Sequence, residues 1–293
     1  MPKRSRPPHR QTTQSNTYRF FVDAGAIHGR DVLLEYGELA HQISTVLRLR
    51  PGENITLLDN SGWQYIVALH TVERSRVAGT VERKELAGGE PRTKLTLYIA
   101  LMRPERFEWV LQKGTELGVS AFVPLICERS TIADADELST HKLERWNRIL
   151  REAAEQSRRG KLPRLAPALF LPAACDHAAQ RGTALLLWEG GGVPSLRSVL
   201  RKTENNETRR QGDNEQQHLP FSPSPQLPVS SSSAHPFSIA LFSGPEGGFS
   251  SSEFETALRY DMIAVTLGPR TLRAETAPIV ATSAILYEMG DLE

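Results

Sequence analysis

Ser243-Gly244-Pro245-Glu246-Gly247-Gly248-Phe249-Ser250 and Leu267-Gly268-Pro269-Arg270-Thr271-Leu272-Arg273-Ala274-Glu275-Thr276 are the two stretches that decide the fold. Each begins where an apolar run ends, residues 237–242 for the first and residues 262–267 for the second. Each also leads into a segment with a helical pattern. If the two runs are neighbouring strands of one parallel sheet, their Gly-Pro turns lie side by side at the carboxyl ends of the strands, where open α/β sheets bind ligands.

The preceding hundred or so residues alternate between strand and helix patterns in the same way. Residues 94–102 are nearly all apolar, as in a strand that is buried on both faces. Residues 104–117 carry apolar side chains at helical spacing and stop at Gly118. A strand at 122–126, a helix at 142–158 and a strand at 184–188 follow. This order predicts an α/β domain with a mainly parallel sheet.

The first part of the chain has a different pattern. Between residue 18 and about residue 90, short apolar runs alternate with turn residues, which predicts a small β-rich domain of the barrel type. One helix is expected over Glu38–Arg48. Residues 87–91, Ala-Gly-Gly-Glu-Pro, are interpreted as a linker to the α/β domain.

Composition narrows the function classes. The 293 residues carry a net charge of +1, with 39% hydrophobic and 24% charged residues, which is ordinary for a globular protein and gives no global argument for nucleic acid. No apolar run approaches the length of a membrane span. Cys127 and Cys175 are far apart in the sequence, which indicates buried thiols in a reducing cytoplasm. The histidines show no metal-ligand spacing, so no metal site is expected.

Two segments are predicted to be disordered. Residues 1–16 are polar and basic without an apolar segment behind them, so they are not a secretory signal; they form either a disordered tail or a basic arm that touches RNA. Residues 203–236 are rich in Asn, Gln, Ser and Pro and cannot bury enough apolar surface to fold, so they are interpreted as a surface insertion.

The Gly-Pro loops are not one of the common nucleotide-binding motifs. No Gly-Lys-Ser/Thr follows Gly244, and the spacing is not GxGxxG. A ligand loop and a purely structural turn both remain open. Arg270 and Arg273 would lie at the mouth of the same crevice and can hold an anionic or carbonyl-rich substrate. Alternatively, they brace the loops by pairing with Glu246 and Glu275.

Three other sets of basic residues each have two interpretations. Arg129 follows a predicted strand, where it can serve a ligand site or pair with Glu128. Arg158 and Arg159 end a helix, where they can bind phosphates or simply interact with the helix dipole. Residues 41–50, which include His41, Arg48 and Arg50, form either an RNA-contacting surface or a solvated basic helix end.

Several of these segments, taken in order, resemble one known family. The stretches that carry the resemblance are Val46 to Gly52, Glu105 to Trp109, Lys113 to Val119, Glu128 to Ser130, Glu155 to Arg159, Gly244 to Gly248 and Leu267 to Thr276. Together they resemble the 16S ribosomal RNA uridine-N3 methyltransferases of the SPOUT class, over nearly the whole chain from Arg19. Each motif alone is weak, but the ordered set is specific.

The resemblance implies both an architecture and an activity. It implies a PUA-like barrel over residues 17–90 and a SPOUT domain with a trefoil knot over residues 91–293. It also implies S-adenosylmethionine as the methyl donor, the 16S rRNA of the small ribosomal subunit as the substrate, and a cytoplasmic homodimer. Residues 203–236 exceed what the family needs and lie between two strands of the expected pocket.

The expected site residues form three groups: the resemblance implies the first, and the chemistry and positions of the residues indicate the other two. The donor pocket would be lined by Leu187, Trp188, Glu189, Gly244, Pro245, Glu246, Gly247, Leu267, Gly268 and Leu272. The catalytic candidates are Arg270, Arg273, Glu275 and Arg129. The RNA-contacting candidates are Arg19, His41, Arg48, Arg50, Arg158 and Arg159.

Methyl transfer from a sulfonium to uridine N3 requires the base to lose its N3 proton, which spreads negative charge over O2 and O4. Arginine donors aimed at those oxygens would stabilise that charge. Glu275 would either orient an arginine or take the proton. The alternatives are a SPOUT methyltransferase that acts on another RNA or base, and a ribosome-assembly factor that binds RNA without catalysis.

Overall fold

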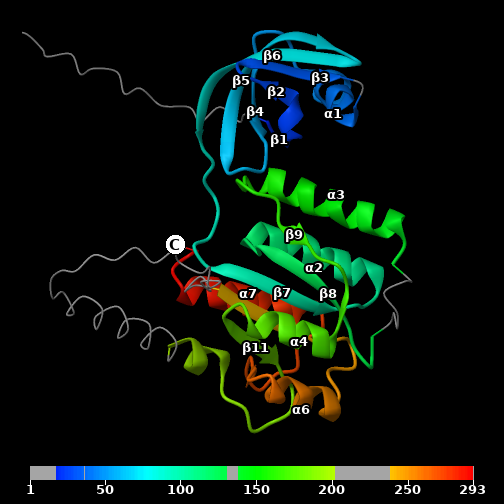
Figure 1. Cartoon of the computed structure of the whole chain (residues 1–293), viewed down its shortest axis with the longest axis vertical. Helices are drawn as coiled ribbons and strands as arrows, with labels where there is room; N and C mark the ends of the chain where they lie inside the picture. Colours follow the sequence, from blue (N-terminus) through cyan, green and yellow to red (C-terminus); the bar gives the residue numbers. More distant parts are fainter. Residues whose placement is uncertain (1–17, 36, 131–137, 202–237, 293) are drawn as a thin grey trace, which may run out of the picture. The chain divides into compact units, whose positions relative to one another are not determined.

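The computed structural model describes residues 18–35, 37–130, 138–201 and 238–292 (Figure 1). The chain divides into two compact units between Ala87 and Gly88, within the predicted linker. The predicted tail at 1–16 and the predicted insertion at 203–236 lie outside the described residues.

The amino-terminal unit is built on a six-stranded, mostly antiparallel sheet in the order β1-β4-β5-β6-β3-β2. Its strands are β1 (Arg19–Phe21), β2 (Ile27–His28), β3 (Asp31–Glu35), β4 (Asn54–Leu58), β5 (Trp63–Glu73) and β6 (Arg76–Leu86). Only the β1–β4 pair is parallel. Among the described residues no pairing joins β1 to β2, so closure of the sheet into a barrel is not seen as a hydrogen-bonded ladder.

The helix of this unit is shorter and less regular than the sequence predicts. A single α-helical turn, α1 (Glu38–His41), continues as a π-helix, η2 (Gln42–Val46), and a short 3-10 helix, η1 (Ala24–Ala26), precedes β2. Arg48 has a φ of 55°, which is left-handed backbone that cannot continue a helix. The helix predicted over Glu38–Arg48 therefore ends before Arg48.

The carboxy-terminal unit contains a seven-stranded sheet in which every pair is parallel. The strand order is β10-β8-β7-β12-β11-β13, and β9 pairs with β8. The strands are β7 (Lys94–Ala100), β8 (Ala121–Ile126), β9 (Arg164–Leu165), β10 (Leu169–Phe170), β11 (Thr183–Leu187), β12 (Ser238–Ser243) and β13 (Ile263–Val265). The predicted α/β class with a mainly parallel sheet is confirmed.

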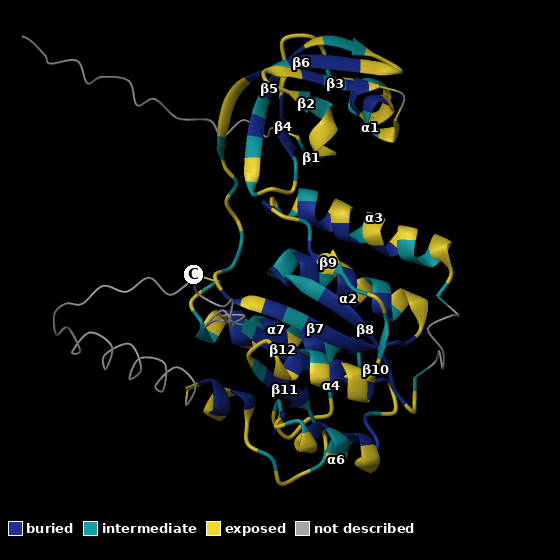
Figure 2. Ribbon diagram, in the orientation of Figure 1, coloured by how far each residue is buried: buried dark blue, intermediate teal, exposed yellow. Residues whose placement is uncertain are grey.

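Helices cover both faces of this sheet. They are α2 (Pro104–Leu117), α3 (Thr140–Gln156), α4 (Leu171–Ala179), α6 (Ser251–Arg259), α7 (Thr276–Glu288) and a helix that includes residues 196–201. Buried side chains of α2, α3 and α7 pack with one set of strand residues, and those of α4 and α6 pack with the alternate set. The strands between these two layers are largely buried in Figure 2, as the near-continuous apolar runs predict.

Local signals in the sequence explain where two of these helices end or begin. Gly118 ends α2 with a φ of 110°, and a Cβ there would lie 2.4 Å from Cγ of Pro91. Ser250 starts α6: its side chain accepts a hydrogen bond from the amide of Glu253, whose carboxylate accepts one from the amide of Ser250. Both predicted boundaries are confirmed. By contrast, α4 is a helix that the sequence reasoning missed.

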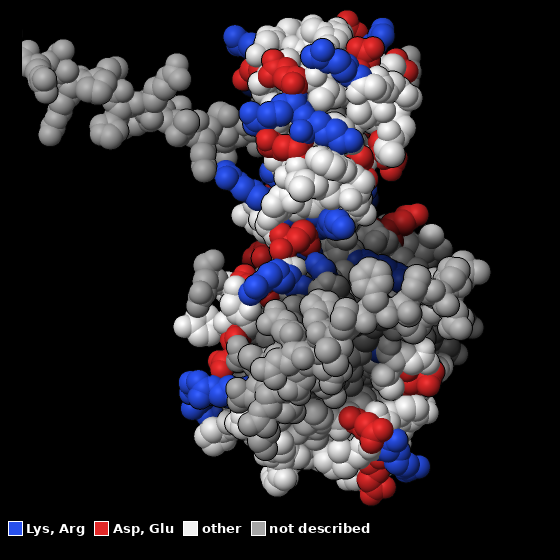
Figure 3. Space-filling model, turned by 60° about the vertical axis from the view of Figure 1, so that its left-hand side comes forward, with Lys and Arg blue, Asp and Glu red and all other residues white. Residues whose placement is uncertain are grey.

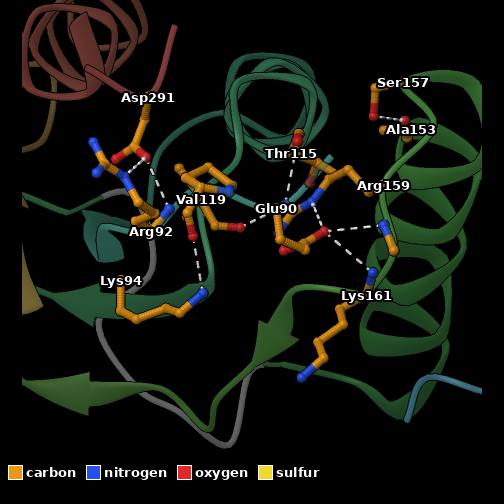
Figure 4. Close-up of polar contacts among 12 residues, drawn as sticks. Glu90, Arg92, Lys94, Thr115, Val119, Ala153, Ser157, Arg159, Lys161 and Asp291 are labelled. Carbon is orange, nitrogen blue, oxygen red and sulfur yellow. Dashed lines mark hydrogen bonds and ion pairs between the residues drawn. The ribbon is translucent and has the colours of Figure 1, made fainter. Parts of the chain in front are cut away.

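Glu90, in the second half of the predicted linker, is held within the carboxy-terminal unit (Figure 4). The carboxylate of Glu90 accepts hydrogen bonds from the guanidinium of Arg159 and from the amides of Gly160 and Lys161. A few residues later, the carboxylate of Asp291 accepts hydrogen bonds from the amides of Arg92 and Thr93. The first strand of the unit is thus connected to residues near the end of the chain.

The direction of β12 decides which edge of the sheet each connection reaches. Ser238, the first residue of β12, pairs with Lys94, the first residue of β7. Its carbonyl group also lies against Gly182, just before β11. The chain therefore enters β12 at the side of the sheet where the parallel strands begin. It leaves β12, at Ser243, at the side where the strands end.

The cysteines, the lengths of the helices and the grouping of possible metal ligands bear on the expectations drawn from composition. Cys127 and Cys175 are both buried and unbridged, and burial raises the pKa of the Cys175 thiol to about 11. Buried thiols were expected. No helix within the described ranges is long and apolar enough to cross a membrane, and no group of acidic, histidine or cysteine side chains in those ranges could hold a metal ion.

Candidate functional site

A cavity of about 640 Å³ lies at the carboxyl ends of β11, β12 and β13. The loops that follow these three strands form its walls, together with Arg129 from the loop after β8. The strand order places β11 between β12 and β13, so the three loops meet at one edge of the sheet. The crevice predicted from the two Gly-Pro stretches is therefore present, and its size is that of a small-molecule site.

The loop after β12 is the most firmly held of the three. Nη1 of Arg129 donates a hydrogen bond to the carbonyl oxygen of Gly247 at 2.7 Å. The ring of Phe249, which is buried, packs against Gly244. The capping box at Ser250 then fixes the point at which the loop becomes α6.

The loop after β11 carries an aromatic side chain into the cavity wall. Trp188 donates its amide to the carbonyl oxygen of Val265 in β13, and its ring packs on that of Phe254 with centroids 4.2 Å apart. A Cβ at Gly190 would lie 2.3 Å from Nε1 of Trp188. The indole ring of Trp188 therefore requires a glycine at position 190.

The loop after β13 closes the remaining side of the cavity. Its first part is held locally, because the hydroxyl of Thr266 accepts a hydrogen bond from the amide of Gly268. The amide of Thr266 is bonded to the carbonyl oxygen of Pro194, so this loop is also tied to the chain that follows β11. Leu267, Leu272 and Ala274 add apolar surface to the lining.

Nine of the ten residues that the resemblance assigns to the donor pocket line this cavity. They are Leu187, Trp188, Glu189, Gly244, Pro245, Gly247, Leu267, Gly268 and Leu272. The tenth, Glu246, lies between two lining residues, but its carboxylate is bonded to Arg106 in α2. The lining combines apolar side chains with backbone groups at glycine positions, which suits a ligand with an aromatic ring and polar substituents.

The catalytic candidates fall into two groups. Arg270 and Arg129 line the cavity, whereas Arg273 and Glu275 do not. Arg273 is exposed two residues before Glu275. The Glu275 carboxylate is largely buried, with 16% of the side chain exposed, and Oε2 lies 3.7 Å from Nη1 of Arg106.

Arg106 is the residue of this site that the sequence reasoning missed. Its Nη1 donates to Oε1 of Glu246 at 2.7 Å and also forms the ion pair with Glu275. The alternative in which Arg270 and Arg273 pair with Glu246 and Glu275 is not seen among the ion pairs of the described residues. Arg106 forms both of these ion pairs instead. Its position in the first turn of α2, where a cation is unfavourable for the helix dipole, was the available signal.

The loop that carries Arg129 is positioned by a buried carboxylate. Glu253, 9% exposed, accepts hydrogen bonds from the amides of Glu128 and Ser250. Arg129 forms its hydrogen bond with Gly247, and the ion pairs found in the described residues do not include the alternative pair between Arg129 and Glu128. Glu253 therefore links the loop after β8 to the helix that follows the glycine loop.

The RNA-contacting candidates of the amino-terminal unit are mostly exposed. Nη1 of half-buried Arg19 donates to Oε1 of Gln64, whereas His41, Arg48 and Arg50 are exposed. On the face shown in Figure 3, lysine and arginine side chains of this unit alternate with aspartate and glutamate. The basic residues thus do not form one continuous field on that face.

In the carboxy-terminal unit, Arg158 and Arg159 have different surroundings. Arg158 is exposed in the turn after α3. Arg159 is 2% exposed, and its guanidinium donates to Glu90 and to the carbonyl oxygens of Thr115 and Val119 (Figure 4). The prediction that Arg159 contacts RNA is therefore contradicted by its burial, since these internal acceptors occupy its guanidinium.

Comparison with known proteins connects this geometry to a family. The sequence pattern described as an RNA methyltransferase domain matches residues 89–286. The ribosomal RNA small subunit methyltransferase E of Bacillus subtilis is 31% identical over 252 residues, which are 86% of this chain and 88% of that protein. The protein of the same name from Synechocystis is 33% identical over 271 residues, or 92% of this chain and 77% of that protein.

Solved structures agree over nearly the whole chain. A methyltransferase of Legionella pneumophila in complex with the bound cofactor SAM superimposes with a TM-score of 0.73 at 26% identity, covering 92% of this chain and 97% of that chain. The ribosomal RNA small subunit methyltransferase E of Neisseria gonorrhoeae, bound to S-adenosyl methionine, gives a TM-score of 0.71 at 28% identity with the same coverage. Because the domain pattern spans more than half of the chain and the relatives align over most of it, the chain belongs to the ribosomal RNA small subunit methyltransferase E family of RNA methyltransferases.

Proposed function

We propose that this chain transfers a methyl group from S-adenosylmethionine to N3 of one uridine in the 16S RNA of the small ribosomal subunit. The observation that carries the proposal is the cavity formed by the three loops after β11, β12 and β13. The names of the relatives and the donor bound in two of the similar structures support the same reaction.

The residues of the cavity fit the proposed donor. Trp188, Leu267 and Leu272 offer apolar surface for the adenine ring and ribose, while the glycine positions leave backbone amides and carbonyls accessible. At Gly268, where φ is 109°, no atom lies within 4 Å of the place that a Cβ would occupy, so a ligand can approach the backbone. When bound there, S-adenosylmethionine supplies a methyl group activated by the sulfonium.

The arginines at the cavity then have distinct tasks. Arg270 lines the cavity and, in this proposal, donates hydrogen bonds to the uracil oxygens as negative charge develops on them. Arg129 holds the glycine loop through Gly247 and presents its positive charge to the same space. Arg273, which is exposed outside the lining, would steer the RNA phosphates or the target base toward Arg270. Glu275 faces Arg106, which supports an orienting role over that of a proton acceptor.

The proposed reaction is tested with small ribosomal subunits from cells that lack the modification. Purified protein and S-adenosylmethionine with a labelled methyl group should label the 16S RNA, and nucleoside analysis should give N3-methyluridine. Large subunits and already modified small subunits serve as controls. Donor binding without transfer would redirect the proposal to another RNA, whereas absence of donor binding would leave the RNA-binding assembly factor.

We also propose that Arg48 and Arg50 contact RNA phosphates. Both are exposed near the end of the helical segment of the amino-terminal unit. Replacing either with glutamine should weaken binding to small subunits without changing which nucleotide is methylated, and should lower the salt slope of log K by about 1 per lost contact. Arg159→Gln is not a suitable comparison because the Arg159 side chain is buried. The control is Arg76→Gln, because Arg76 lies in the same unit and pairs with Glu35. Unchanged salt slopes would exclude phosphate contacts by these arginines.

Helix α7 supports the proposal of a homodimer. Its sequence is apolar on nearly all sides, as expected for a fully buried helix. Yet Val280 and Tyr287, seven residues apart and therefore on one face, are 42% and 64% exposed in the single chain. A second copy packed on this face would bury them.

Replacing Tyr287 with aspartate should therefore shift the protein from dimer to monomer. The expected shift follows from placing a charge in an apolar interface and is measured by light scattering during gel filtration at several concentrations. Leu258→Asp provides a control, because Leu258 is a comparably exposed apolar residue on α6. A monomeric wild-type protein, or a Tyr287→Asp protein that stays dimeric, would contradict this interface.

The finer features of the fold and the cellular location are proposed on the resemblance. The order β12-β11-β13 and the return of the chain from β13 to α7, which packs against β7 and β12, are compatible with a trefoil knot. The mostly antiparallel sheet of the first unit is compatible with a PUA-like barrel. A crystal structure of this chain tests both features, and cell fractionation tests the proposed cytoplasmic location.

A further inference from the structure

Arg106 lies where a cation does not stabilise its own helix. It is the third residue of α2, which begins at Pro104, and the helix dipole favours negative side chains in this turn. The Arg106 side chain is nevertheless only 34% exposed, and its guanidinium is directed at two carboxylates from elsewhere in the chain. The contacts of Arg106 therefore serve something other than the stability of α2.

Both carboxylates belong to loops that form the cavity. Glu246 lies between Pro245 and Gly247, which line the cavity, in the loop after β12. Glu275 follows the lining residue Ala274 at the end of the loop after β13. Nη1 of Arg106 lies 2.7 Å from Oε1 of Glu246 and 3.7 Å from Oε2 of Glu275. One cation thus joins the two loops from outside the cavity.

The surroundings of Glu275 make this cation necessary. Its Oε2 is buried and has no hydrogen-bond partner among the described residues, so the ion pair with Arg106 is the interaction found for that oxygen. An uncompensated buried carboxylate is costly, and a second carboxylate on the adjacent loop would repel it. Without the guanidinium, we expect the ends of the two loops to move apart.

We propose that Arg106 is a positioning residue for the methyl donor, which sets the separation of the two Gly-Pro loops by pairing with Glu246 and Glu275. The inference rests on the proposed function, because it takes S-adenosylmethionine as the ligand of the cavity. It adds a residue from α2, outside the cavity lining, to those that determine donor affinity.

The sign of the effect distinguishes positioning from simple electrostatics. Removing a positive charge near the cavity should strengthen binding of a cationic donor if only Coulomb attraction matters. If Arg106 holds the loops, Arg106→Met should instead weaken donor binding by about tenfold or more. Arg106→Lys keeps the charge but lacks the planar fork, so it should restore only part of the affinity.

The test is calorimetric titration of S-adenosylmethionine into the full-length wild type, Arg106→Met, Arg106→Lys, Glu275→Gln and the double variant Arg106→Met/Glu275→Gln. In the double variant, the loss should be clearly smaller than the product of the single losses, because both changes break the same connection. Arg145→Met is the matched control. Nε of Arg145 lies 2.6 Å from Oε1 of Glu108, which belongs to α2 as Arg106 does, and neither residue lines the cavity. Loss of this ion pair should leave the affinity for the donor unchanged. Thermal unfolding of every variant reports any general loss of structure.

Each outcome has a defined meaning. If the wild type binds the donor and Arg106→Met binds it equally or more tightly, the positioning role is wrong and the proposed cofactor stands. Multiplicative losses in the double variant would also overturn the role, because the two residues would then act independently. If the wild type itself does not bind S-adenosylmethionine, the proposed function fails and this inference fails with it.

Discussion

Replacing Arg159 with methionine should lower the free energy of unfolding by about 3–5 kcal/mol, because it leaves a partner carboxylate largely buried without its cation. The Arg159 side chain is 2% exposed and that of Glu90 is 18% exposed. Nε and Nη2 of Arg159 donate to Glu90, while Nη1 donates to the carbonyl oxygens of Thr115 and Val119. Methionine fills similar volume but satisfies none of these acceptors. Urea denaturation followed by circular dichroism measures the loss.

Two further variants make this result specific. Arg145→Met removes an ion pair whose arginine is 61% exposed to solvent, so it should change the free energy of unfolding far less than Arg159→Met does. The double variant Arg159→Met/Glu90→Leu should be less destabilised than the sum of the single variants, since no buried charge then remains. A loss below about 1 kcal/mol for Arg159→Met would show that water reaches Glu90 and replaces the guanidinium.

Replacing Arg270 with alanine should lower kcat for methylation of small subunits by about 10²–10³, while the Kd for S-adenosylmethionine changes little. The expected loss in rate follows from removing a donor that acts on charge formed during the reaction. Arg270 lies in the cavity lining among residues of the loop after β13 but is itself exposed, so its removal should not disturb the core. Single-turnover methyl transfer and donor titration provide the two measurements.

Arg273→Ala is the comparison for this prediction. Arg273 has the same chemistry, belongs to the same loop and lies outside the cavity lining. Its loss should raise the KM for small subunits more than it lowers kcat. A larger fall in kcat for Arg273→Ala than for Arg270→Ala would reverse the assignment. An equal loss of donor affinity and turnover in Arg270→Ala would show that Arg270 shapes the pocket and does not act on the reacting base.

The parts of the fold that were predictable from sequence depend on short-range signals. The bounds of α2 follow from its apolar spacing and from Gly118, and the start of α6 follows from the pattern Ser250 to Glu253. The cavity loops were also predictable, because parallel strands must deliver their following loops to one edge of the sheet. The helix α4 was missed since alanines on its buried face give little contrast with its exposed face.

What the sequence could not supply are partners that are far apart along the chain. Arg106 and Glu246 are separated by 140 positions, and Arg159 and Glu90 by 69. Nothing local distinguishes Arg159, which is buried, from Arg158, which is exposed one position earlier. Only the three-dimensional structure could therefore show that the two arginines at the end of α3 differ, with Arg158 exposed and Arg159 buried.

Because the chain enters β12 where the parallel strands begin, the structure restricts where chain length can differ among relatives. Ser238 lies beside the first residue of β7, at the edge of the sheet opposite the cavity. Chain added or deleted immediately before Ser238 therefore joins the domain far from the reacting groups, whereas one residue added after Ser243 would displace the glycine loop. Differences in length among relatives should therefore be common before Ser238 and rare after Ser243.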